Sequence, residues 1–136
     1  ELAFDDHRDV TLSLSWCDAL RSLEGIASPR VAELSLLSCG GLERLDALAD
    51  ARDLRRLHVQ QCGRVVDLAP IASLGGLTEL GLTHNPALVD YAPIAGLANL
   101  TQLDLFGDTV PAPLRGRHVG ADAIRAVLDA LAAPRR

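Results

Sequence analysis

A short apolar pattern returns through most of this 136-residue chain at a constant spacing. In its full form it reads Leu-x-x-Leu-x-Leu-x-x-Cys or Asn, with Val in place of Leu at some positions. Copies begin at Val31, Leu54, Leu77 and Leu100, which are 23 residues apart, and an imperfect copy begins at Asp9. Because one such unit cannot bury its own apolar side chains, five of them predict a stack of equivalent units with a shared core.

The Leu-x-Leu part of each copy predicts a short strand with one buried face. Equivalent strands of successive copies should lie side by side in a parallel sheet, and each connecting segment should return the chain to the starting edge. Two columns of core residues are expected to cross this sheet: Leu12, Leu34, Leu57, Leu80 and Leu103, then Leu14, Leu36, Val59, Leu82 and Leu105.

The pattern resembles the signature of the leucine-rich repeat family over residues 9–108. The connecting segments share a second motif, at residues 65–71 and 88–94, that is similar to the short-repeat class of bacterial internalin-like proteins. The resemblance implies an α/β fold, a right-handed solenoid or horseshoe. Its short parallel strands would form the concave side, and 3-10 or irregular turns would form the convex side.

The N-terminal end departs from the repeat. Phe4 stands 22 residues before Ile26, at the last core position of a unit that would precede the first copy. We therefore expect residues 1–8 to be the remnant of an upstream repeat or an N-terminal cap.

The repeat also fails after Asp108, and residues 109–136 are expected to form a C-terminal cap. Prolines and glycine between residues 111 and 116 predict a loop. Residues 121–131 predict an amphipathic helix, which should cover the open end of the core. Its apolar face carries Ile124, Val127, Leu128 and Leu131.

Composition excludes several functions. All 13 basic residues are Arg, and a chain without Lys holds neither a Walker-type phosphate loop nor a Schiff-base lysine. The net charge of −5 disfavours a nucleic-acid partner, since phosphate binding needs a basic excess. No apolar stretch reaches the length of about 20 residues that a membrane span needs, so we expect no membrane partner.

The cysteines and histidines do not predict a catalytic or metal site. Cys17, Cys39 and Cys62 share one position of the repeat with Asn85 and Asp108, so we expect inward side chains that bond to turn backbone, and free buried thiols. The histidines lack metal-ligand spacing, and no nucleophile stands beside them in the register. The chain is predicted to be no enzyme and to bind no cofactor or metal.

The outward side chains of the strands carry the candidate binding residues. Glu33, Arg56 and Glu79 on adjacent strands predict an alternating ladder of charges, which either satisfies itself or forms a polar recognition strip. His58 and Asp104 stand in the next column, where Gly81 is expected to leave a gap.

Three large apolar residues also point out of the predicted sheet: Trp16, Leu37 and Phe106. Exposed apolar side chains on a flat sheet are typical of a protein-binding site, and Trp is enriched among binding hot spots. Alternatively, an upstream repeat covers Trp16 and the C-terminal loop covers Phe106.

The resemblance implies a non-enzymatic module that senses ligands or binds a protein partner on its concave face. The setting it suggests is the C-terminal sensor region of a larger cytoplasmic bacterial NACHT-type signalling NTPase, related to nucleotide-binding immune receptors. Contacts with upstream domains of the same chain are then expected. The alternative is an extracellular internalin-like module for adhesion or surface binding.

Overall fold

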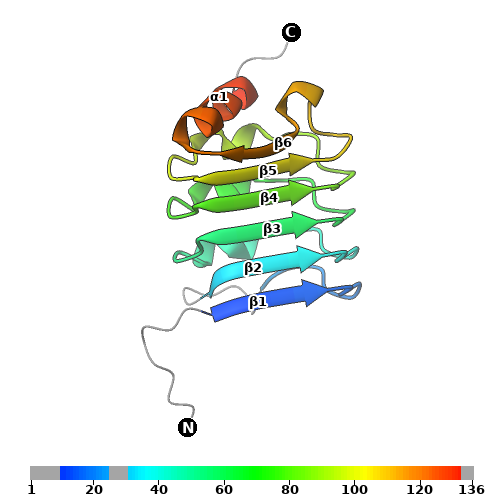
Figure 1. Ribbon diagram of the computed structural model, residues 1–136. Helices are drawn as coiled ribbons and strands as arrows, with labels where there is room; N and C mark the ends of the chain where they lie inside the picture. The colour runs from blue at the N-terminus through cyan, green and yellow to red at the C-terminus, as the bar shows by residue number, and fades with distance from the viewer. Residues whose placement is uncertain (1–9, 25–30, 133–136) are drawn as a thin grey trace.

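The computed structural model describes residues 10–24 and 31–132, and these residues form one open sheet of six strands (Figure 1). The strands follow one another in chain order: β1 Val10–Ser15, β2 Val31–Leu37, β3 Arg56–Gln60, β4 Glu79–Thr83, β5 Gln102–Phe106 and β6 Gly116–Val119. Strands β1 to β5 are parallel, and β6 is antiparallel to β5. The expected α/β class and parallel sheet are therefore confirmed.

The strand register brings equivalent positions of the repeat together. Leu34, Leu57, Leu80 and Leu103 are direct partners across β2 to β5, and each is at most 1% exposed. The second column is fully buried from β2 to β5 as well. Leu12 and Leu14 are only half-buried, because no described strand lies beyond β1. The predicted core is thus complete only from the second copy onward.

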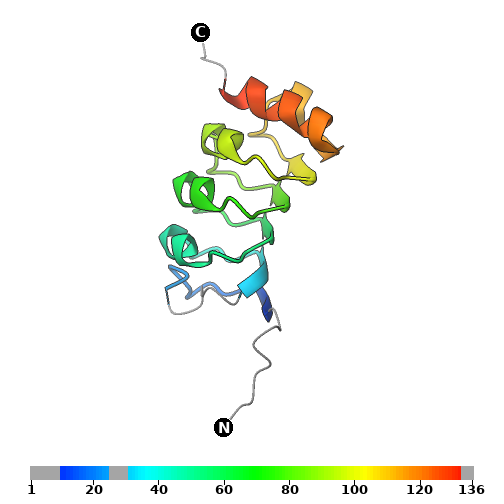
Figure 2. The same ribbon diagram turned by 90° about the vertical axis from the view of Figure 1, so that its left-hand side faces the viewer.

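Short 3-10 helices connect the strands and lie on one side of the sheet (Figure 2). They are η1 Asp46–Asp50, η2 Ala69–Ser73 and η3 Ala92–Gly96. In η2 and η3 a proline stands in the first turn, where its fixed φ suits a helix start. The carboxylates of Asp67 and Asp90 accept hydrogen bonds from the first amides of these helices, those of Ala69 and Ala92, at 2.9 and 3.1 Å.

The segment after β5 differs from the expected loop. It forms a short 3-10 helix, η4 Ala112–Leu114, and then the strand β6, which pairs with Gln102–Leu105 of β5. Asp104 lies opposite Arg117 in this pairing. The ion pair between these two side chains joins β6 to β5. Residues 111–115 form the expected connection, with η4 inside it, and the prediction missed the strand β6 that begins at Gly116.

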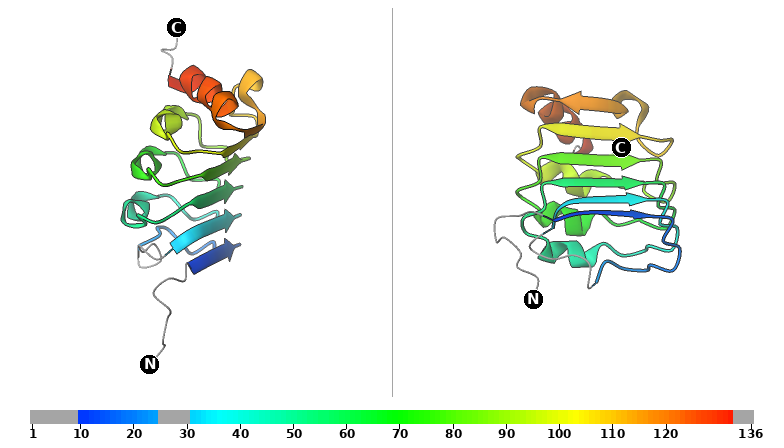
Figure 3. Two further views of the ribbon diagram at one scale, coloured as in Figure 1. Left: turned by 60° about the vertical axis from the view of Figure 1, so that its left-hand side comes forward. Right: turned by 60° about the horizontal axis from the view of Figure 1, so that its bottom comes forward.

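The chain then forms the helix α1, Ala121–Ala132, which packs against η3 and β6 at the end of the sheet (Figure 3). Ile124, Val127 and Leu128 are buried in the same core as the strands, and Leu131 is partly buried. No helix in the described part of the chain has the length and apolar character to cross a membrane. The expectations for residues 1–8 and for Ile26 fall outside the described residues.

Candidate protein-binding surface

The side of the sheet opposite the 3-10 helices is called the open face here (Figure 2). The register groups its side chains into three columns. These are Thr11, Glu33, Arg56, Glu79 and Gln102; Ser13, Ser35, His58, Gly81 and Asp104; and Ser15, Leu37, Gln60, Thr83 and Phe106. The predicted site residues of the strands therefore lie on one face, but their contacts differ from the prediction.

The charge ladder ends after its first pair. Arg56 Nη1 donates a hydrogen bond to Glu33 Oε1 at 3.0 Å. The next carboxylate in the column, Glu79, has its Oε2 2.5 Å from His58 Nε2. The predicted row of alternating charges on adjacent strands is confirmed by the register, but its second carboxylate pairs with the histidine in the next column.

Gly81 makes room for the pair of His58 and Glu79. A Cβ atom at position 81 would collide with the His58 ring, chiefly with its Nδ1 atom. The gap expected beside Gly81 is therefore filled by the imidazole of the neighbouring strand. The side chains of His58 and Glu79 are 37% and 24% exposed, so the pair is partly shielded from solvent.

Asp104 is buried, although it was predicted to be a binding residue. Arg117 donates from Nε to Oδ1 at 3.0 Å and from Nη2 to Oδ2 at 3.3 Å. Gln102 donates a further bond to Oδ2 at 3.4 Å. The hydrogen bond and the charge of Asp104 raise the pKa of Arg117 above its ordinary value. Asp104 is thus engaged within the sheet, and the sequence pattern missed its partner Arg117.

The carboxyl ends of β1 to β5 form a separate strip, named the uncharged margin. Its residues are Ser15, Leu37, Gln60, Thr83 and Phe106, followed by Trp16, Ser38, Gln61, His84 and Gly107. None of these ten residues carries a carboxylate or a guanidinium group. Trp16 is 71% exposed and Phe106 is 39% exposed, so the margin presents apolar surface at both ends.

The residues of this margin that directly follow the strands share an unusual backbone conformation. Trp16, Ser38, Gln61 and His84 all have φ between 52° and 59°, in the left-handed region. The amide of each donates to a carbonyl of the next strand, for example Trp16 to Leu37 at 2.9 Å. Non-glycine residues seldom adopt this conformation. Gly107 is the glycine at this position of the repeat and has a φ of 123°, but the four preceding residues are not glycines, and this feature was not predicted.

Phe106 remains accessible. The strand β6 pairs with β5 only from Gln102 to Leu105 and ends before Phe106. The alternative that the C-terminal loop covers this ring is therefore wrong. Phe106 in β5 is three strand spacings from Leu37 in β2, which corresponds to about 14 Å.

Trp16 should behave as a solvated side chain. We expect its fluorescence emission to lie near that of free indole and to be quenched readily by acrylamide. Replacing Trp16 with alanine should lower the free energy of unfolding far less than the ~3–5 kcal/mol that deleting a buried aromatic costs. A blue-shifted, unquenched emission together with a large loss of stability would contradict this.

Cys39, Cys62 and Asn85 share one position of the repeat, and their buried side chains bond to backbone carbonyls, as predicted. Cys39 Sγ points to the carbonyl of Leu14 at 3.6 Å, Cys62 Sγ to that of Leu36 at 3.9 Å, and Asn85 Nδ2 donates to that of Val59 at 2.9 Å. Asp108 was predicted to point inward in the same way, and it is exposed. Its carboxylate has no donor group with which to reach a strand carbonyl, so burial would leave the charge unpaired.

Thiol labelling should separate the three free cysteines. Cys17 is only half-buried, whereas Cys39 and Cys62 are fully buried, and burial raises the pKa of the Cys62 thiol. Since the thiolate is the reactive form, mass spectrometry should find Cys17 alkylated first in the native protein. The other two should react only after denaturation, and Cys17→Ser should remove the native signal. Native labelling of Cys62 at the rate of Cys17 would contradict this assignment.

The described residues contain no group of three or more His, Cys, Asp or Glu side chains that could hold a metal ion. Comparison with known proteins finds no family model that matches this chain, and no curated protein that matches it.

Proposed function

We propose that this chain is a leucine-rich repeat module, a right-handed solenoid whose open face is the concave side, and that it binds a protein partner along the uncharged margin. The five registered copies of the repeat, the parallel strands and the recurring 3-10 helices support the fold assignment. Trp16, directly after β1, donates its amide to the carbonyl of Leu37 in β2, and these two residues form one apolar end of the proposed contact.

The observation that carries this proposal is that the charged side chains of the open face are paired with one another, whereas the margin beside them has none. In the described part of this face, Glu33 pairs with Arg56 and Asp104 with Arg117, and the carboxylate of Glu79 pairs with the imidazole of His58. The margin beside them is uncharged and exposes Trp16 and Phe106. Charged residues are depleted at the centre of protein interfaces and aromatic residues are enriched there, which is the composition of this margin.

The same features favour a protein partner over a substrate or a nucleic acid. His58 has a carboxylate as its partner, and not a hydroxyl or thiol that a general base would activate. The guanidinium groups of Arg56 and Arg117, which the described strands place on the open face, are paired with carboxylates and offer no basic excess to phosphates. We therefore propose a non-enzymatic interaction module with no nucleic-acid or membrane partner.

As its setting we propose the sensor region of a larger cytoplasmic bacterial NACHT-type protein, where contacts with other domains of that protein would also form. The proline-containing helices η2 and η3 favour a second candidate, an extracellular internalin-like module, because its outer turns have the same motif. The full-length gene distinguishes the two. An upstream P-loop ATPase supports the first, and a signal peptide or wall anchor supports the second.

Photo-crosslinking tests the binding surface directly. A photoreactive phenylalanine analogue replaces Thr83, which lies half-exposed in the middle of the margin. In cells that express the intact protein, we expect a discrete crosslinked adduct with one partner. Trp16→Ala should abolish this adduct, since truncating a hot-spot aromatic costs about 2 kcal/mol or more of binding free energy.

The matched control places the same analogue at Val66, which is 54% exposed on a connecting segment and outside the open face. That position should give no adduct with the same partner. Equal crosslinking from positions 66 and 83, or an adduct unaffected by Trp16→Ala, would refute the uncharged margin as the site.

A further inference from the structure

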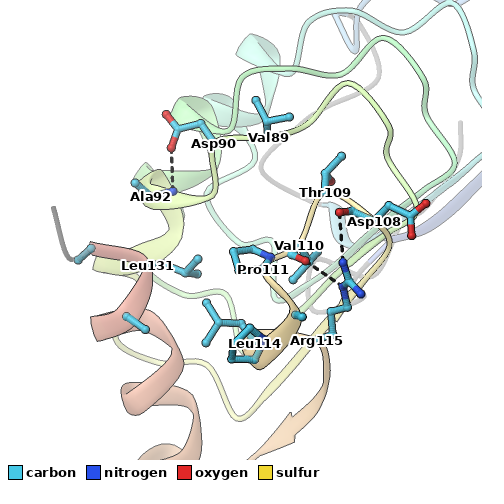
Figure 4. Close-up of a pocket in the computed structure, with 14 residues that line it drawn as sticks. Val89, Asp90, Ala92, Asp108, Thr109, Val110, Pro111, Leu114, Arg115 and Leu131 are labelled. Carbon is cyan, nitrogen blue, oxygen red and sulfur yellow. Dashed lines mark hydrogen bonds between the residues drawn. The ribbon is translucent and has the colours of Figure 1, made fainter. Parts of the chain in front are cut away.

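A cavity of about 760 Å³ lies at the α1 end of the molecule, and none of the residues that line it belongs to the uncharged margin (Figure 4). Three segments line it: Val89 to Ala92 at the start of η3, the loop from Asp108 to Arg115, and the last residues of α1. Its volume is within the range of pockets that bind small ligands or a few peptide side chains. The proposed contact around Trp16 and Leu37 does not use it.

The walls of this cavity are mainly aliphatic. Val89, Pro111, Leu114 and Leu131 face it from the three segments (Figure 4). Val89 is 60% exposed, and Leu114 and Leu131 are partly exposed. Apolar side chains that converge on one hollow from separate segments provide a place for an aliphatic group of a ligand.

The polar groups of the cavity carry a negative excess. Asp90 and Asp108 are both exposed at its lining. The carbonyl end of α1 adds partial negative charge, and no basic residue stands in the last turn of this helix. Among the described residues of the lining, Arg115 carries the one guanidinium, which donates to the backbone carbonyls of Val110 and Asp108, at 2.9 and 3.2 Å, and so ties the loop together.

We propose that this cavity is a second binding site, which takes a peptide segment of a protein partner with an aliphatic side chain next to a lysine or arginine. The aliphatic group packs between Val89 and Leu131, and the cation lies near Asp90, Asp108 and the carbonyl end of α1. The charges decide against an anionic ligand, because a phosphate or carboxylate would meet two carboxylates and a helix C-terminus. This site is independent of the function proposed for the open face.

The chain offers matched controls for this proposal, because the preceding repeat has the same residues outside the cavity. Val66 is equivalent to Val89, and it is similarly exposed. Asp67 is equivalent to Asp90, and both carboxylates accept a hydrogen bond from the amide two residues later. Asparagine retains this acceptor oxygen, so the Asp→Asn variants change the charge and keep the turn.

The test uses the full-length chain and fluorescein-labelled synthetic peptides with blocked ends. The probe contains Leu-Arg between alanines, and the two comparison peptides contain Leu-Gln or Ala-Arg. We expect fluorescence anisotropy to show saturable binding of the Leu-Arg peptide, about tenfold tighter than of either comparison peptide. Asp90→Asn and Val89→Ser should each weaken binding of the Leu-Arg peptide about tenfold, whereas Asp67→Asn and Val66→Ser should leave it unchanged.

Several results would overturn the proposal: no saturable binding, equal binding of the Leu-Arg and Leu-Gln peptides, or equal losses from the equivalent substitutions in the two repeats. Thermal unfolding of every variant checks that the fold is intact. A chain ending at Ala132 that binds the peptide when the full chain does not would show that the chain's own last residues compete for the cavity. That result would also overturn the assignment to a separate partner.

Discussion

Replacing Leu80 with alanine should lower the free energy of unfolding by about 2–5 kcal/mol. The side chain of Leu80 is fully buried in the middle of the sheet, directly between Leu57 and Leu103. Its removal would leave a cavity that cannot collapse, because hydrogen-bonded strands hold the neighbouring columns in place. Urea denaturation followed by far-ultraviolet circular dichroism measures the loss.

Aspartate at the same position should have a larger effect, with no cooperative unfolding transition left. A carboxylate at this point of the core has no partner, and burying an unpaired charge costs more than a small domain's stability can supply. Thr83→Ala is the control, since Thr83 lies on the same strand with its side chain half-exposed. Its effect should stay within about 0.5 kcal/mol. A Leu80→Asp protein with a normal denaturation curve would show that the strand register is wrong.

The buried columns were predictable from the sequence because their signal is redundant. Each column recurs every 23 residues, and strands in register place these residues side by side. An error at one copy, such as the half-buried Leu12, does not disturb the others. The identity and spacing of apolar residues therefore determine the sheet without any knowledge of individual contacts.

The contacts of the open face were not predictable in the same way. Glu79 lies next to Arg56 in the register and yet binds His58, since Gly81 leaves room for the imidazole. Which of these two partners Glu79 binds depends on side-chain geometry, and the amino-acid sequence does not specify that geometry directly. The partner of Asp104 is 13 residues away on a strand without an apolar pattern.

The cavity beside α1 was also invisible in the sequence. It arises where three segments of different structure meet, and only one of them belongs to the repeat. Val89 and Asp90 have the same identities as their counterparts in the preceding repeat, Val66 and Asp67. They differ in lying beside α1 and the loop after β5, with which they line the cavity. Function at this site therefore depends on the end of the array and not on the repeat itself.

Ending the chain at Gly120 should destabilise the protein more than any single surface substitution. The helix α1 contributes three buried aliphatic side chains, and each is worth about 1.5–3 kcal/mol when transferred from water into the core. Its loss would also expose the side of η3 against which it packs. We expect a lower midpoint of urea denaturation, binding of a hydrophobic dye, and aggregation that increases with protein concentration.

A point substitution distinguishes loss of packing from a general effect of truncation. Leu128 is fully buried, and Leu128→Ala should lower the free energy of unfolding by about 2–5 kcal/mol. Ala126→Ser on the exposed side of the same helix is the control and should cost about 0.5 kcal/mol or less. If α1 were instead a detachable segment, both the truncated chain and Leu128→Ala would unfold at the wild-type urea concentration. The close packing of Leu128 in the shared core argues for the opposite result, because core side chains cannot be removed without loss of the contacts around them.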